Sequence, residues 1–171
     1  MALVRSAKIK TGSHAENFTL PDTEGKLYSL ADFRDKKGLV IVFTCNHCPF
    51  ARAAWPKLIT LYPKYGAEIG FAAINPNDAE KFPKDSYGEM QKKKAEWQIP
   101  FPYLHDATQE TARAYDAVCT PDFYLFKNEN GAFTLYYHGN VSEAPLQGLI
   151  KNDPPLEKQS PSMGCSIKWK A

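Results

Sequence analysis

A run of apolar residues that ends in two closely spaced cysteines constrains this fold most. The run, Leu39 to Phe43, is rich in β-branched side chains, which is typical of a strand buried on both faces of a sheet. It leads into Cys45-Asn46-His47-Cys48, and Pro49 follows. Because proline is tolerated in the first turn of a helix, Pro49 predicts that a helix begins at the second cysteine. We therefore expect both thiols between a buried strand and a helix N-terminus.

The remaining sequence alternates between strand-like and helix-like segments, which favours an α/β fold. We expect parallel first strands joined by helical crossovers, then an antiparallel final pair, so that a mixed central sheet has helices on both faces. A hairpin precedes the buried strand, and the C-terminal helix is short because of its Pro and Gly residues. The expected segments are a hairpin (18–30), a helix from residue 49, a strand (68–74), a helix (87–98), a strand (103–105), a helix (109–117), a hairpin (123–137) and a short helix (146–150).

The length of 171 residues predicts a single domain, 1–171, with a core of about 12–139. We expect residues 140–171 to be irregular and to pack on the domain, because the tail contains apolar residues such as Ile167 and Trp169. The first residues, up to about 14, give no periodic signal.

Composition excludes some partners and predicts a compartment. A hydrophobic fraction of 43% and a formal charge of +2 are ordinary for a globular protein, so neither nucleic acid nor a membrane is an expected partner. Four cysteines are too few and too unevenly spaced for a disulfide-stapled secreted scaffold. With no secretory signal visible, we expect a reducing, cytoplasmic location.

The two-residue spacing of Cys45 and Cys48 suits thiol chemistry. A helix N-terminus favours the thiolate, and we expect Cys45, just before the first turn, to gain most. His47 adds positive charge nearby, so Asn46 and His47 are expected to modulate the couple, and Thr44 is a candidate hydrogen-bond donor to the thiolate. One helical turn brings the two sulfurs within disulfide distance.

Thr120 and Pro121 form a second candidate element, between a helix and the last hairpin. A proline just before a strand is a candidate for a cis peptide bond. Such a loop facing the cysteines leaves the Thr120 backbone free to pair with a substrate chain. Cys119 is a possible extra thiol, although a free cysteine more often packs as a small apolar residue.

These motifs together resemble the thioredoxin superfamily, in particular its redoxin branch of peroxiredoxin-like (AhpC/TSA-like) proteins. The resemblance covers residues 12–139 and the final tail, and it is to bacterial thioredoxin family proteins with the Cys-Asn-His-Cys-Pro-Phe motif. It implies a thioredoxin-like fold, with Cys45 as nucleophile, Cys48 as resolving cysteine and Pro121 as the cis-proline. One departure is that Leu39 to Phe43 lacks the buried carboxylate that thioredoxins place there, so proton transfer needs another group or water.

The function hypothesis is a thiol-disulfide oxidoreductase acting on a disulfide-bearing protein or a small thiol substrate with an unknown electron donor. It needs no cofactor beyond the Cys45–Cys48 disulfide and no metal, and we expect a monomer or weak homodimer. One alternative is a thiol peroxidase, although a threonine three residues before Cys45 is missing. A second alternative is a metal-binding or interaction module, in which Cys45, Cys48 and either His47 or His105 hold copper or zinc.

Overall fold

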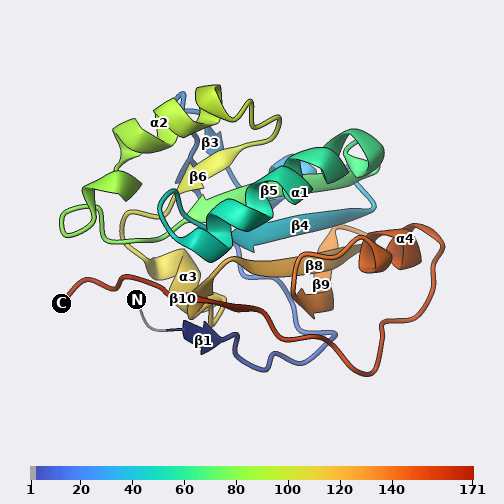
Figure 1. The fold of residues 1–171 in the computed structure, drawn as a ribbon. Helices are drawn as coiled ribbons and strands as arrows, with labels where there is room; N and C mark the ends of the chain where they lie inside the picture. Colours follow the sequence, from blue (N-terminus) through green and yellow to red (C-terminus); the bar gives the residue numbers. More distant parts are fainter. Residues whose placement is uncertain (1–2) are drawn as a thin grey trace.

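A five-stranded mixed sheet forms the centre of the computed structural model, which describes residues 3–171 (Figure 1). The strand order is β6-β5-β4-β8-β9. β4 pairs in parallel with β5, as β5 does with β6, whereas β8 is antiparallel to both β4 and β9. The predicted α/β class with a mixed sheet is confirmed. The strands are β4 (Gly38–Phe43), β5 (Ile69–Asn75), β6 (Tyr103–His105), β8 (Asp122–Glu129) and β9 (Ala132–Gly139).

Helices cover both faces of this sheet, as predicted (Figure 1). Side chains alternate along the fully buried β4, so that Val40 and Val42 pack on one face while Leu39 and Ile41 pack on the other. The first face is covered by α1 (Pro49–Tyr65), α2 (Tyr87–Glu96) and α4 (Ala144–Ile150), and the second by α3 (Glu110–Ala114) with the N-terminal segment.

The two helices α1 and α2 begin at the predicted residues. α1 begins at Pro49, and Ser86 caps α2 by accepting a hydrogen bond from the Glu89 backbone at 3.2 Å. Pro56 and Pro63 lie inside α1, which stops at Tyr65. Each of these prolines removes only one backbone hydrogen bond of the helix. The buried face of α1 packs against the sheet, and this packing keeps the helix intact.

Short elements surround the main sheet. The predicted N-terminal hairpin is present but reduced to β2 (Leu20–Pro21) and β3 (Leu27–Tyr28), followed by the 3₁₀ turn η1 (Leu30–Phe33). A second 3₁₀ turn, η2 (Pro83–Asp85), immediately precedes the cap of α2.

A separate three-stranded sheet joins the two ends of the chain. Its order is β1 (Leu3–Arg5), β10 (Met163–Ser166) and β7 (Cys119–Thr120), and all pairings are antiparallel. The C-terminal segment, expected to be irregular apart from a short helix, contains that helix as α4 and also the strand β10, which was not predicted. In the tail, Ile167 is buried in the core.

Among residues 3–171, the structure contains no helix that is both long and apolar enough to cross a membrane.

Candidate active site

The two cysteines lie where the sequence predicts, in the short connection between β4 and α1. Cys48 is the N-cap of α1 and Pro49 is its first residue. The Cys48 backbone N–H donates a hydrogen bond to Cys45 Sγ at 3.3 Å. Both side chains are buried, with exposed fractions of 0% for Cys45 and 1% for Cys48.

The Thr120–Pro121 segment forms the wall opposite the thiols. Its peptide bond is cis, and the Thr120 hydroxyl lies 3.5 Å from Cys45 Sγ. Cys48 Sγ lies 3.5 Å from the Thr120 carbonyl oxygen. The predicted role of Thr44 is wrong: within residues 3–171 its hydroxyl has no hydrogen-bond partner, and the hydroxyl beside the thiols belongs to Thr120.

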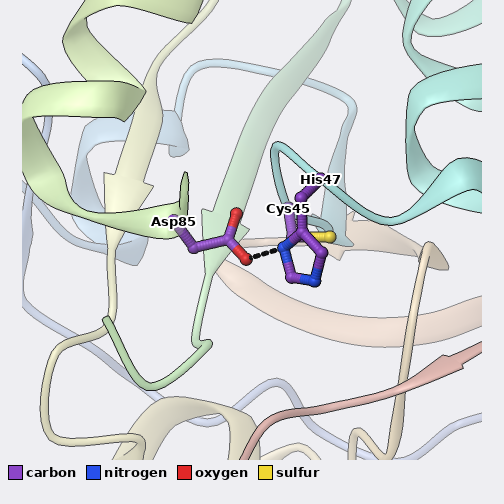
Figure 2. Close-up of side chains that lie close together, drawn as sticks. All are labelled: Cys45, His47 and Asp85. Atoms are coloured by element: carbon purple, nitrogen blue, oxygen red, sulfur yellow. Dashed lines mark hydrogen bonds and ion pairs between the residues drawn. The ribbon is translucent and has the colours of Figure 1, made fainter. Parts of the chain in front are cut away.

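A buried carboxylate that sequence analysis missed stands next to the thiols. Asp85, at the end of η2, has no exposed surface. Figure 2 shows its carboxylate pointing at the imidazole of His47, whose Nδ1 forms a short hydrogen bond with Asp85 Oδ2. The negative charge of Asp85 acts on Cys45 through space. The site therefore has a carboxylate after all, contributed by a turn far from β4 in sequence.

Asp85 also fixes the loop that contains the cysteines. Its Oδ1 accepts a hydrogen bond of 2.7 Å from the Asn46 backbone N–H, and its Oδ2 accepts one of 2.9 Å from the Asn77 side chain. The Asn75 amide donates to Oδ1 at 3.3 Å. A buried charge is tolerated where it is paired and fully hydrogen-bonded, and Asp85 meets that condition.

Asn46 and His47 are also held by neighbouring side chains. Asn46 accepts a 2.7 Å hydrogen bond from the Tyr103 hydroxyl and donates one of 2.9 Å to the Lys84 carbonyl. The His47 ring stacks on Phe82 with its centroid 5.8 Å away. Both residues therefore position the cysteine loop, in addition to the electrostatic role that the sequence predicted for His47.

The pKa values of the two thiols are shifted in opposite directions. A hydrogen bond from the Cys45 thiol is the largest cause that lowers the pKa of Cys48, to about 4, and hydrogen bonds from Cys165 also lower it. The pKa of Cys45 is raised, first by its hydrogen bond to Cys48, then by burial and by the charge of Asp85. The expectation that Cys45 gains most from the helix terminus is therefore corrected. Cys48, not Cys45, caps α1, and Cys45 faces the carboxylate.

The other two cysteines differ in their distance from this pair. Cys165, on β10, belongs to one buried cluster with Cys45, Cys48 and Ala51. Cys119, on β7, is buried outside that cluster, and burial raises the pKa of its thiol. The third thiol beside the pair is thus Cys165, whereas the sequence singled out Cys119.

Three side chains of this site are also of types that bind metal ions. Ligand atoms of Cys45, His47 and Asp85 lie within 4.8 Å of one another (Figure 2). His105, considered in the sequence as a ligand, is not part of this group. The Asp85 oxygens already accept hydrogen bonds from Asn46, Asn75 and Asn77, so a metal ion would have to compete with these donors.

Comparison with known proteins places this chain in a family. A sequence model of the AhpC/TSA family matches residues 11–140. The chain belongs to the AhpC/TSA family. The family assignment agrees with the resemblance to the redoxin branch of the thioredoxin superfamily that the sequence motifs indicated.

Two solved structures resemble this chain over nearly its whole length. An uncharacterized conserved protein from Geobacillus kaustophilus is 40% identical, with a TM-score of 0.92 and coverage of 99% of this chain and 97% of the other. A hypothetical protein from Sinorhizobium meliloti is 35% identical, with a TM-score of 0.91 and coverage of 98% of both chains.

Relatives with a named activity are more distant. The thiol-disulfide oxidoreductase ResA of Bacillus subtilis is 27% identical over 154 residues, which cover 87% of this chain and 79% of ResA. A putative thiol:disulfide interchange protein DsbE from Chlorobium tepidum has a TM-score of 0.64 at 24% identity, covering 84% of this chain and 95% of the other. The fold is thus the thioredoxin-like fold that the motifs predicted.

The opposite pKa shifts predict the order in which the thiols ionise. In the reduced protein, thiolate absorbance at 240 nm should rise with a midpoint near pH 4 as Cys48 loses its proton. Cys45→Ala removes the main donor to Cys48, so this midpoint should move to higher pH. Cys48→Ala should abolish the step, and a step that persists near pH 4 in Cys48→Ala contradicts the assignment.

The hydrogen bonds around Asp85 predict a large stability loss on substitution. Asp85→Asn places an amide against the Asn75 and Asn77 donors, so urea unfolding should show a decrease of about 2 kcal/mol or more in the free energy of unfolding. Glu80→Gln, an exposed change in the same loop region, should alter that free energy by less than about 0.5 kcal/mol. Equal effects of the two substitutions would show that Asp85 does not organise the loop.

Proposed function

We propose that this protein is a thiol-disulfide oxidoreductase that uses the Cys45–Cys48 dithiol/disulfide couple. The observation that carries the proposal is the placement of two buried cysteines at the N-terminus of α1, where the Cys48 backbone N–H donates to Cys45 Sγ at 3.3 Å. A second support is the activity named for distant relatives such as ResA. A thiolate present at neutral pH is the form that attacks disulfides.

The reaction consists of two thiol–disulfide exchanges. One site thiolate attacks a sulfur of the substrate disulfide and forms a mixed disulfide, while the other substrate sulfur leaves as a thiolate. The second site cysteine then attacks the mixed disulfide, so the substrate leaves as a dithiol and Cys45–Cys48 becomes a disulfide. Two electrons pass from the protein to the substrate. An external dithiol donor returns them, and we propose no cofactor besides this disulfide.

The residues around the couple can stabilise charge and accept a proton during the reaction. The Cys48 backbone N–H and the Thr120 hydroxyl lie against Cys45 Sγ and stabilise negative charge there whenever Cys45 is the leaving group. The Asp85–His47 pair, a few ångströms away, supplies a carboxylate and an imidazole that can take up the proton released during disulfide formation.

Activity measurements test the proposal directly. In an insulin reduction assay with dithiothreitol, Cys45→Ser and Cys48→Ser should each lower turnover at least about 100-fold, because neither variant can form the Cys45–Cys48 disulfide. Cys119→Ala should retain turnover, since Cys119 lies outside the thiol cluster. Full activity of Cys45→Ser would contradict the proposal.

Trapping of mixed disulfides identifies the attacking sulfur. The resemblance to thioredoxins implies attack by Cys45, in which case Cys48→Ser accumulates the mixed disulfide with the substrate. The low pKa of Cys48 favours attack by Cys48, in which case Cys45→Ser accumulates it. Mass spectrometry of the trapped adduct distinguishes the two.

A metal-binding role is the second candidate function, and the Cys45, His47 and Asp85 cluster is the observation that favours it. Metal analysis of anaerobically purified protein is the test. One bound ion per chain without disulfide turnover would replace the oxidoreductase proposal. A thiol peroxidase would be indicated by rapid consumption of hydrogen peroxide by the reduced protein. A cytoplasmic location and a monomeric or weakly dimeric state stay predictions from the sequence.

A further inference from the structure

The chain's own tail occupies the backbone edge that was expected to be free for a substrate. β10 pairs antiparallel with β7, with Cys165 opposite Thr120. The Ile167 backbone N–H donates to the Val118 carbonyl at 3.0 Å, and hydrogen-bonded pairs in an antiparallel ladder recur at every second residue. Cys165 and Thr120 are therefore also a hydrogen-bonded pair, and the Thr120 backbone is already in use.

The tail fits this edge closely. A Cβ atom added to Gly164 would lie 2.1 Å from the Thr120 carbonyl oxygen, so only glycine allows this approach. The outer edge of β10 pairs with β1. Upstream of β10, the Ser162 hydroxyl donates to the buried Asp122 carboxylate at 3.0 Å. Downstream, the Lys168 backbone N–H donates to the Asn77 side chain at 2.9 Å. Contacts on both sides of Cys165 thus hold it in register.

This register places the Cys165 thiol against the redox couple. Cys165 is 4% exposed and shares a cluster with Cys45 and Cys48. Cys165 lies close enough to Cys48 to lower the pKa of the Cys48 thiol. Burial raises the pKa of Cys165 to about 11, so it is a thiol beside the Cys48 thiolate in the reduced protein.

We propose that Cys165 is a third redox cysteine that exchanges with the Cys45–Cys48 disulfide. Cys165 sulfur attacks Cys48 Sγ, the Cys48–Cys165 bond forms, and the Cys45–Cys48 bond breaks. Cys45 leaves from that bond and takes up the proton that Cys165 loses. One disulfide is present before and after, so no external oxidant or reductant is needed. This inference rests on the proposed function, because it requires an oxidised couple.

The exchange has a consequence for substrate access. A Cys48–Cys165 disulfide ties β10 to the N-terminus of α1, so the Thr120 edge stays covered while that disulfide exists. Reduction returns Cys165 to a thiol, and β10 is then held only by non-covalent contacts. A substrate chain that pairs with Thr120 has to displace β10 from that edge.

Disulfide mapping in Cys45→Ser tests the proposal. Oxidation of this variant with diamide, digestion without reduction and mass spectrometry should reveal a Cys48–Cys165 linked peptide. The double variant Cys45→Ser/Cys165→Ser is the control and should lack it. Absence of the linked peptide in Cys45→Ser, or linkage of Cys48 to Cys119 instead, would overturn the proposal.

Two glycine variants test whether β10 positions the Cys165 thiol beside Cys48. Gly164→Ala forces β10 away from Thr120, so the yield of the linked peptide in the Cys45→Ser background should fall at least tenfold. Gly88→Ala, on an open surface of α2, should leave the yield unchanged. Equal yields in the two variants would show that β10 does not position Cys165.

Alkylation of the oxidised wild-type protein detects the exchange itself. A fraction of molecules should carry the label on Cys45 rather than on Cys165, and Cys165→Ser should remove that fraction. Label on Cys165 alone would contradict the exchange while leaving the oxidoreductase proposal intact. Failure of the oxidoreductase proposal looks different: the wild-type protein then shows neither a Cys45–Cys48 disulfide nor insulin reduction.

Discussion

The complete burial of β4 is the constraint on which the site depends. Both faces of this strand are covered by separate parts of the core, so its end has a fixed position and direction. Cys45 lies two residues beyond that end, and α1 begins after Cys48. Two sulfurs are thereby held at a helix terminus in a dry environment, where hydrogen bonds act more strongly on ionisation than they do in water.

The surrounding polar groups shift the pKa values of the two thiols in opposite directions. Asp85 orders the loop through Asn46 and places negative charge near Cys45, whereas Cys45 and Cys165 lower the pKa of Cys48. Charge in the reduced pair therefore rests on Cys48. The tail contributes to that asymmetry as well as covering the site, so the thiol chemistry and the closed state of the Thr120 edge are physically linked.

Features encoded by neighbouring residues were predictable, and those encoded by distant pairings were not. The β4–α1 junction follows from an apolar run and Pro49, both of which act locally. Asp85 turns inward whereas its neighbour Ser86 caps α2, and nothing in the local sequence shows this difference. β1 and β10 have little strand signal of their own, because each exists through pairing across the whole chain length. The position of Cys165 beside the couple could not be predicted for the same reason.

The reduction potential of the protein tests the central claim that Cys45 and Cys48 form one redox couple. The fraction of disulfide is measured by mass spectrometry after equilibration in buffers of defined thiol/disulfide ratio. We predict a single two-electron transition in which the oxidised-to-reduced ratio changes tenfold for about every 30 mV, with Cys48 losing its alkylation as a Cys45–Cys48 disulfide forms. Independent reactivity of the two cysteines, with no disulfide between them at any potential, would contradict the account.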